Sequence, residues 1–301
     1  MSGILITGGT GSLGRALVKK LINDDYYLRI VVFSRDEHKQ AQMAEEFVSP
    51  KLRFFIGDVR DYERLKLAMS QVDEIVHAAA LKIVPSGEYN PTEYILTNVV
   101  GTMNVLKAAA ARGVPYVLTV STDKAVSPVN LYGATKLCAE KLTLAANNMF
   151  PGMNCSVARY GNVANSNGSV IRIFKKQFDN KELFTITDLR MTRYWIELDE
   201  AADFVIASLQ KGKEKRVFIP YMPSFYVKDL ADAFLGDKKL GTDHIKLIGI
   251  RNGEKLHEQI NETSYSNVND TWLNVKQLRS KLREFEVLGS KSKRPDVGLK
   301  K

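Results

Sequence analysis

Short apolar runs alternate with helix-like stretches along the first 160 residues, and this alternation limits the possible folds more than any other feature of the sequence. Strands that are buried on both faces of a sheet appear as continuous apolar runs, and helical connections between them require parallel strands. Six alternations of this kind predict a doubly wound parallel α/β sheet. The runs, rich in β-branched residues, are 4–6, 28–33, 52–56, 74–77, 116–120 and 155–158, and the clearest helical stretches are 14–22, 93–111 and 131–147.

The pattern of apolar and polar residues changes after about residue 161. Loops rich in Gly, Asn and Ser replace the regular alternation, with scattered aromatic residues and shorter periodic segments. Structure added to a doubly wound sheet usually forms a second lobe that closes one side of a ligand cleft. We therefore expect a core domain over residues 1–160 and a smaller substrate-binding lobe over residues 161–301, from which some segments return to the core. A basic tail is expected at about 290–301.

Composition places the chain among ordinary globular proteins. Hydrophobic residues make up 45% of it and charged residues 26%, and no apolar run approaches the roughly 20 residues that cross a bilayer. A predicted strand begins almost at the first residue, which leaves no room for a signal peptide. The two cysteines, Cys138 and Cys155, form no disulfide pattern and suit a reducing compartment. These features predict a cytoplasmic protein without a membrane partner.

The net charge of +9 raises the question of nucleic-acid binding. Residues 276–301 contain nine Lys or Arg and three Asp or Glu, so +6 of the total lies in this terminal stretch. The remainder of the chain is close to neutral, and a basic terminus is more often a solvated tail than a nucleic-acid surface. We therefore expect no nucleic-acid partner.

A glycine-rich segment directly follows the first predicted strand and opens a helical stretch. Its glycines stand three residues apart, which lets the backbone turn tightly and approach a pyrophosphate. Free N–H groups and the helix dipole then stabilise the phosphate charge. This is the setting that the dinucleotide-binding motif of a Rossmann fold requires. The residues expected to bind the cofactor here are Gly8, Thr10, Gly11, Ser12, Leu13 and Gly14.

The end of the second predicted strand favours NADP over NAD. A site that prefers NAD usually places Asp or Glu at this point to bind the ribose 2′-hydroxyl. This strand instead ends in Ser34 and Arg35, with Lys39 further along, and a guanidinium suits a 2′-phosphate. Asp36 lies close enough to leave NAD open.

The third and fourth predicted strands end in further candidate cofactor contacts. Asp58 can accept a hydrogen bond from the adenine amino group, whereas Asp61 is also a candidate cap of the next helix. Small residues after His77 suit a backbone that passes beneath a cofactor, and His77 itself is expected to be a buried strand histidine. Val59 and Ala79 are further expected contacts of the cofactor, as are Tyr132 and Lys136 later in the chain.

Tyr132 and Lys136 stand four residues apart on a predicted helix and therefore share a face. The ammonium of Lys136 would stabilise the phenolate and lower the pKa of Tyr132 from about 10 toward neutrality. Tyr132 could then take a hydroxyl proton while hydride leaves the same carbon. The alternative is that Tyr132 only packs in the core. Ser121 and Thr122 end the fifth strand beside this dyad and are expected to contact the cofactor and the substrate, respectively, with Thr122 also in a catalytic role.

These motifs occur in one order over residues 3 to about 258, together with TGGTGSLGRAL, HAAALKIVP, STDKAVSPVNLYGATKLCAEKL, RYGNV and GEKLHE. With these motifs in this order, the chain resembles the extended short-chain dehydrogenase/reductases, and among them the inverting UDP-N-acetylglucosamine (UDP-GlcNAc) 4,6-dehydratases. The most specific element is Asp123-Lys124 together with Tyr132.

The resemblance implies a reaction and its catalytic residues. After oxidation at C4 of the sugar, Lys124 removes the C5 proton and Asp123 protonates the departing C6 hydroxyl. Hydride then returns to C6, and C5 is protonated from the opposite face, which inverts that centre. Burial favours a neutral Lys and a protonated Asp, while their mutual attraction opposes both. A loop ion pair without catalytic function is the alternative for Asp123-Lys124.

The resemblance also implies substrate contacts, and no metal ion. Arg is suited to clamp a diphosphate because its planar fork matches the oxyanions. Two departures from the family pattern are Asn167, where Arg is usual, and Asn252, where Pro is usual, and the chain is dissimilar after about residue 264. The expected substrate-binding residues are Lys82, which also faces the cofactor, Thr122, Asn162, Ser169, Val170, Arg193, Arg251 and Glu254.

Several alternatives remain open. A 4-epimerase or reductase would use the same dyad on the same fold, and a retaining 4,6-dehydratase usually carries Met at the position of Tyr132. A non-catalytic NADP-binding regulator belongs to a different class, against which the intact dyad argues. The resemblance further implies a homo-oligomer, either a dimer or a hexamer.

Overall fold

The computed structural model describes residues 2–166, 168–236 and 243–288. The chain forms two compact units, one made of Met1–Tyr160 with Leu198–Pro220 and the other of Gly161–Glu197 with Tyr221–Lys301. Asn167 and the predicted tail at 290–301 lie outside the described residues.

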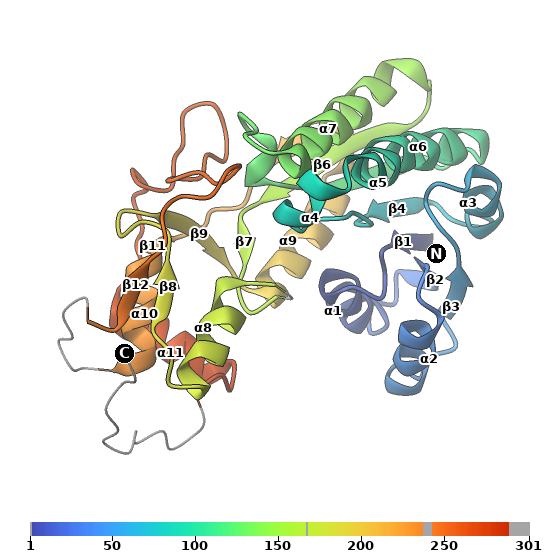
Figure 1. Ribbon diagram of the computed structural model, residues 1–301. Coiled ribbons are helices and arrows are strands. Elements are labelled where there is room, and N and C mark those ends of the chain that lie inside the picture. The colour runs from blue at the N-terminus through green and yellow to red at the C-terminus, as the bar shows by residue number, and fades with distance from the viewer. Residues whose placement is uncertain (1, 167, 237–242, 289–301) are drawn as a thin grey trace. The chain divides into compact units, whose positions relative to one another are not determined.

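A seven-stranded parallel sheet forms the centre of the first unit, which confirms the predicted doubly wound Rossmann fold (Figure 1). All six predicted strands are present, and a short seventh strand joins them after the chain returns from the second unit. In spatial order the strands are β10 (Val217–Phe218), β6 (Asn154–Tyr160), β5 (Tyr116–Thr122), β4 (Glu74–His77), β1 (Ser2–Thr7), β2 (Tyr27–Ser34) and β3 (Leu52–Ile56).

Helices cover this sheet because alternate strand residues point to opposite faces and both faces are apolar. Leu5, Ile75 and Val117 lie in one buried cluster with residues of α3 (Tyr62–Ala68) and α6 (Gly101–Ala111). The other helical segments of the unit are α1 (Ser12–Leu21), α2 (Glu37–Glu46), α4 (Val84–Tyr89), α5 (Pro91–Tyr94), the π-helix η1 (Ile95–Val100), η2 (Asp123–Ala125), α7 (Leu131–Met149), α9 (Leu198–Gln210) and η3 (Gly212–Glu214).

Side-chain caps fix where several of these helices begin. Asp36, Asp61 and Asn130 each accept a hydrogen bond from the backbone N–H three residues later, at the start of α2, α3 and α7. Such caps satisfy N–H groups that the first turn of a helix leaves unpaired. The alternative role of Asp61 as a helix cap is therefore the one observed.

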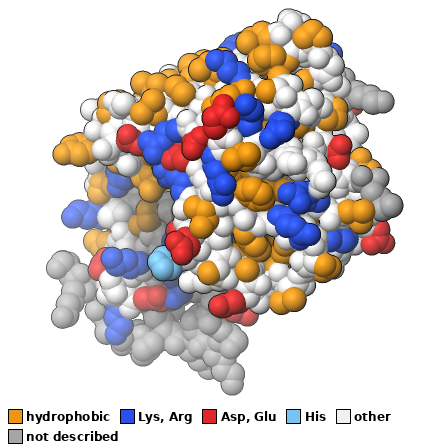
Figure 2. Space-filling view, turned by 90° about the vertical axis from the view of Figure 1, so that its right-hand side faces the viewer, with side chains coloured by type: hydrophobic (Ala, Val, Ile, Leu, Met, Phe, Trp, Pro, Cys, Tyr) orange, Lys and Arg blue, Asp and Glu red, His pale blue; other side chains and the backbone are white. Residues whose placement is uncertain are grey.

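Opposite charges lie close together on the first unit. Figure 2 views the molecule from the side of Figure 1 where α2 and α3 lie, and there basic and acidic side chains are mixed with hydrophobic ones. Ion pairs of this unit include Arg60 with Glu93 at 2.8 Å and Lys66 with Glu63 at 3.2 Å.

In its described residues, the second unit combines small sheets with three helices around an aromatic core. Phe174, Phe184 and Phe234 contact one another edge to face or tilted, and Leu278 packs in the same cluster. The elements are a sheet of β11 (Ser224–Tyr226), β9 (Thr192–Ile196) and β7 (Asn162–Val163), a pair of β12 (Ile245–Leu247) and β8 (Phe184–Ile186), and the helices α8 (Val170–Asp179), α10 (Val227–Leu235) and α11 (Val275–Glu284).

Within the three described ranges, the structure contains no helix with the length and apolar character needed to cross a membrane.

Candidate active site

The glycine-rich loop after β1 has a backbone conformation and close contacts that favour glycine. Gly8 has a φ of +67°, and a Cβ atom there would lie 2.9 Å from the Cα atom of Ala79. A Cβ on Gly14 would lie 2.4 Å from the carbonyl oxygen of Gly9. The loop therefore runs directly against the residues that follow β4, and side chains at these positions would push the two apart.

The same loop leads into the N-terminus of α1 without a competing anion. Gly11 is the N-cap and offers no side-chain hydrogen bond, and the first turn contains no acidic residue. The first N–H groups of a helix lack intrahelical partners and carry the positive end of its dipole. Ser12, Leu13 and Gly14 occupy this first turn, and Thr10 is buried just before it. The geometry suits the pyrophosphate of a dinucleotide.

His77 joins β4 to its neighbours and is buried, as predicted. Its Nδ1 atom lies 2.8 Å from the Thr7 hydroxyl and its Nε2 atom 2.9 Å from the Thr102 hydroxyl, and the N–H of Ala79 donates to Thr7 Oγ1 at 3.2 Å. Burial, with a smaller effect from Lys136, lowers the pKa of His77 to about 3. The imidazole is therefore neutral near pH 7 and aligns the ends of β1 and β4.

Charged residues at the ends of β2 and β3 form local pairs. Asp36 accepts from the Lys39 backbone N–H and lies 3.0 Å from its ammonium. Its carboxylate is thus engaged by its own helix. Arg35 lies 3.6 Å from Asp58. Burial would raise the pKa of Asp58, but hydrogen bonds from Arg60 outweigh it and lower the pKa, so Asp58 is ionised.

Two further predicted contacts at this edge are buried. The hydroxyl of Ser34 accepts from the Gln40 amide at 3.0 Å. Val59 packs so closely against α6 that a Cβ on Gly101 would lie 2.7 Å from its Cγ2 atom. Both side chains therefore shape the ends of their strands.

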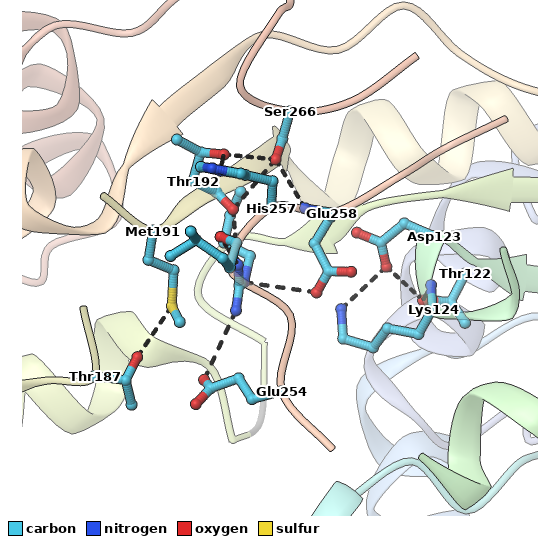
Figure 3. A network of polar contacts seen from close by, with 12 residues as sticks. Thr122, Asp123, Lys124, Thr187, Met191, Thr192, Glu254, His257, Glu258 and Ser266 are labelled. Carbon is cyan, nitrogen blue, oxygen red and sulfur yellow. Dashed lines mark hydrogen bonds and ion pairs between the residues drawn. The ribbon is translucent and has the colours of Figure 1, made fainter. Parts of the chain in front are cut away.

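The turn after β5 places an acid and a base in direct contact. Asp123 is fully buried, and its Oδ1 atom lies 3.0 Å from the ammonium of Lys124 and 2.9 Å from the Thr122 hydroxyl that donates to it. Figure 3 shows the Lys124 side chain pointing to this carboxylate. Thr122 also caps η2 by accepting from the Lys124 backbone N–H. Ser121, just before it, has a buried hydroxyl with no hydrogen-bond partner among the described residues.

The N-terminus of α7 is pressed against this turn. A Cβ on Gly133 would lie 2.2 Å from the carbonyl oxygen of Lys124. The glycine next to Tyr132 therefore lets the helix approach, and the charge of Lys124 acts on the phenol of Tyr132. The structure brings Thr122, Asp123, Lys124 and Tyr132 together.

The electrostatics of the dyad differ from the expectation. Burial raises the pKa of Tyr132 to about 12, and the lysine that opposes this increase is Lys124. Lys136 instead donates to the carbonyl oxygen of Val120 at 2.7 Å, and burial lowers its pKa to about 8. Lowering of the Tyr132 pKa to near neutrality by Lys136 is therefore not observed: the phenol of the protein alone stays protonated near pH 7.

Asn98 organises the site but was not anticipated from the sequence. Its side-chain amide accepts from the N–H of Leu81 at 2.8 Å, donates to the Leu81 carbonyl at 2.9 Å and donates to Thr135 at 3.0 Å. Thr135 in turn donates to the Tyr132 carbonyl oxygen. The signal in the sequence is a polar residue inside the apolar run ILTNVV, which forms a π-helix, a feature frequent at functional sites.

The two hydrogen bonds between the Asn98 side chain and the Leu81 backbone fix the chain next to Lys82. Partial burial, followed by repulsion from Lys124, lowers the pKa of Lys82. The two lysines therefore lie within electrostatic reach of each other, as expected for two residues of one site.

In the second unit, Arg193 is a buried cation of β9 that pairs with two acidic residues, Glu254 and Glu258, which Figure 3 labels. It is 8% exposed, donates to the Thr192 carbonyl at 2.7 Å and lies 3.7 Å from Glu254 and 3.6 Å from Glu258. His257 contacts the Thr192 hydroxyl at 2.8 Å. The guanidinium is thus already balanced by two carboxylates.

The other predicted substrate residues of this unit occupy two separate segments. Asn162 is exposed on β7, and Ser169 and Val170 begin α8. Arg251 is exposed, and its carbonyl accepts from the N–H of Glu254 at 3.1 Å. Asn252 is exposed in the same turn. Among the described residues, no group of three His, Cys, Asp or Glu side chains could hold a metal ion.

Comparison with known proteins identifies the family. Residues 4–276 match the model of a family described as polysaccharide biosynthesis protein. A Campylobacter jejuni protein named UDP-N-acetylglucosamine 4,6-dehydratase (inverting) is 50% identical over 259 residues, which cover 85% of this chain and 76% of that protein. The chain belongs to the polysaccharide biosynthesis protein family.

Other members carry a different name. A Rickettsia conorii protein named UDP-glucose 4-epimerase is 43% identical over 264 residues, with 85% of this chain and 76% of that protein covered. The predicted resemblance to the extended dehydrogenase/reductases, and among them to the inverting dehydratases, is confirmed by the more similar relative.

Solved structures agree with the fold. Pen from Bacillus thuringiensis is 31% identical with a TM-score of 0.85, over 95% of this chain and 98% of that one. DesIV, a dTDP-glucose 4,6-dehydratase from Streptomyces venezuelae solved with NAD and TYD bound, is 21% identical with a TM-score of 0.80, over 94% and 96% of the two chains.

Substitution of Gly8 by Ala tests the phosphate-binding loop. We expect binding of NADP to weaken at least tenfold, because the new Cβ would collide with the backbone at Ala79 and displace the loop. Gly113→Ala is the matched control, since Gly113 has nearly the same φ of +69° but open space around it. Calorimetric titration with NADP measures both. Equal, small losses in the two variants would show that the loop does not bind the cofactor.

Proposed function

We propose that this protein is an inverting UDP-GlcNAc 4,6-dehydratase, a hydro-lyase that converts UDP-GlcNAc to UDP-2-acetamido-2,6-dideoxy-β-L-arabino-hex-4-ulose. The observation that carries the proposal is the contact of 3.0 Å between Lys124 and the fully buried Asp123, on a turn pressed against the helix of Tyr132. The relative that bears this name is 50% identical over most of the chain. Elimination of water needs a base and an acid together, and this pair supplies both.

The glycine loop and the ends of β2 to β5 are proposed to hold NADP. Support comes from the glycine-favouring backbone at Gly8, the uncapped N-terminus of α1 and the unpartnered hydroxyl of Ser121. When bound, the nicotinamide would supply a reversible hydride acceptor for C4 and donor for C6. Arg35 would face the 2′-phosphate, because Asp36 is engaged as a helix cap.

Tyr132 is proposed to accept the proton of the C4 hydroxyl. Its phenolate must form within the complex, because burial holds the pKa of Tyr132 at about 12 in the protein alone. Lys124 and a hydrogen bond with Thr122 both favour the phenolate. Lys136 is proposed to bind the ribose of the cofactor and to add positive charge on the same helical face.

Asp123 and Lys124 are proposed to carry out the elimination. Transfer of one proton along their 3.0 Å contact converts the ion pair into a neutral amine and a neutral carboxylic acid. Full burial of Asp123 favours the neutral pair, since separated charges lose solvation there. Lys124 would then take the C5 proton, and Asp123 would protonate the C6 hydroxyl as its bond to C6 breaks and water leaves.

The substrate-binding role of the second unit is also a proposal. Arg251 is exposed and suits the diphosphate, whereas Arg193 is balanced by Glu254 and Glu258 and would orient them. We propose that Asn162, Ser169 and Val170 in this unit, and Lys82 and Thr122 in the first, contribute the remaining contacts. Homo-oligomer formation and a cytoplasmic location stay predictions.

A 4-epimerase is the second candidate, because relatives at 43% identity bear that name. An epimerase needs only the removal and return of the C4 hydroxyl proton and the C4 hydride, and it gives a product of unchanged mass. The proposed reaction instead uses the acid and base of the β5 turn and releases water.

The mass and isotope content of the product separate these functions. In D₂O with UDP-GlcNAc, we expect a product lighter by one water that contains deuterium at C5, while C6 receives the hydrogen that left C4. Mass spectrometry and proton NMR measure both. An isomer of unchanged mass would indicate the epimerase, and a dehydrated product with the C5 configuration retained would refute inversion.

Substitution of Arg35 by Ala tests the preference for NADP. We expect NADP binding to weaken roughly tenfold or more, because a charge-assisted hydrogen bond to phosphate contributes about 1.5–3 kcal/mol, while NAD binding changes little. Arg53→Ala is a control, since Arg53 donates to backbone carbonyls of its own strand region. Equal effects of Arg35→Ala on NADP and NAD would exclude a contact to the 2′-phosphate.

A further inference from the structure

Polar side chains attach one face of α7 to the sheet beneath it. Lys136, Glu140 and Thr143 follow Tyr132 along this face and are 4%, 2% and 0% exposed. Lys136 donates to the Val120 carbonyl, and Thr143 donates to the Thr119 hydroxyl at 2.8 Å. Buried polar groups of this kind must all be satisfied, so each fixes the helix at a defined position on β5 and β6.

Glu140 forms a buried ion pair with Arg159 of β6. Two hydrogen bonds of 2.8 and 2.5 Å join the guanidinium to the two carboxylate oxygens. Bidentate pairs of this type are the strongest and most directional polar contacts in proteins. Arg159 therefore holds the carboxylate of Glu140 in one place, one helical turn beyond Lys136. The proposed reaction does not use the Glu140–Arg159 pair.

The position of Glu140 matters because Lys136 is a buried cation. Burial disfavours its charge and lowers the pKa of Lys136 to about 8, and Glu140 is the charged group that acts against this decrease. His77 on β4 is within electrostatic reach of Lys136 and is neutral near pH 7. Tyr132 lies one turn before it on α7 and is protonated in the protein alone.

We propose that Glu140, held in place by Arg159, is a positioning residue that keeps Lys136 charged over the pH range in which the site works. The carboxylate lies one helical turn beyond Lys136 and acts on the ammonium through its charge, while two hydrogen bonds to Arg159 hold it in place. The ammonium donates to the Val120 carbonyl of β5. The consequence for catalysis rests on the function proposed above, whereas the charge of Lys136 does not.

Carbon-13 NMR of the lysine side chains tests this inference without substrate. The full-length protein is labelled at lysine Cε, and the Lys136 signal is identified by its loss in Lys136→Met. The wild-type signal should titrate with a midpoint near pH 8. In Glu140→Gln the midpoint should move to lower pH by about one unit, because the negative charge that favours the ammonium is gone while the hydrogen bonds to Arg159 can persist.

Two controls separate charge from structure. Thr143→Val removes a buried hydrogen bond of the same helical face without a change in charge, and it should leave the midpoint in place. Glu140→Asp keeps the carboxylate and should restore most of the shift. An unchanged midpoint in Glu140→Gln, or an equal shift in Thr143→Val, would overturn the proposal. If Glu140→Gln does not fold, Glu140→Gln with Arg159→Met is compared with Arg159→Met alone and should titrate at lower pH, because only the charge at position 140 differs between them.

The pH dependence of turnover then tests the catalytic consequence. In Glu140→Gln, the loss of UDP-GlcNAc dehydration at high pH should begin about one unit lower than in the wild type, and Thr143→Val should keep the wild-type profile. If the Lys136 midpoint shifts but the pH dependence of dehydration does not, the charge of Lys136 does not govern turnover and the catalytic consequence is refuted. Absence of any dehydration in the wild type would refute the proposed function, while the NMR titration would still decide the charge of Lys136.

Discussion

The contact between Asp123 and Lys124 is the constraint on which the rest of the site depends. A fully buried carboxylate is unfavourable unless charge and hydrogen bonds stabilise it, and here the ammonium and the Thr122 hydroxyl both contact its Oδ1 atom. The pair is held on a tight turn at the end of β5, and Gly133 lets the next helix lie directly on that turn. The same burial that makes the pair costly also makes proton exchange between its members feasible.

The remainder of the first unit fixes that turn relative to its neighbours. Asn98 ties the segment after β4 to the helix of Tyr132 through Thr135, and the Glu140–Arg159 pair ties the same helix to β6. Both links attach this helix near the carboxyl ends of parallel strands, which is where parallel sheets collect their functional groups. Because dehydration and epimerisation both begin with oxidation at C4, the proposed acid and base on the β5 turn are what would distinguish the two reactions.

Local sequence signals predicted the sheet and the glycine loop because both depend on residues close together in the chain. The position of Asn98 and the Glu140–Arg159 pair could not be found in this way, since residue types alone do not reveal which polar groups are buried together. The pKa of Tyr132 was misjudged for a related reason. The spacing of the dyad places Lys136 on the correct face, but only the structure shows its ammonium bonded to the Val120 carbonyl. The short, long-range strand pairs of the second unit left no periodic signal.

Rapid-mixing absorbance of the nicotinamide is the most direct test of the central claim. With Lys124→Met, bound cofactor and one equivalent of UDP-GlcNAc, Tyr132 can still support oxidation at C4, but no base is left to remove the C5 proton. The account predicts that reduced nicotinamide accumulates and persists in this variant, whereas in the wild type it appears only transiently. Full dehydration by Lys124→Met at the wild-type rate, without accumulation, would contradict the assignment of the base.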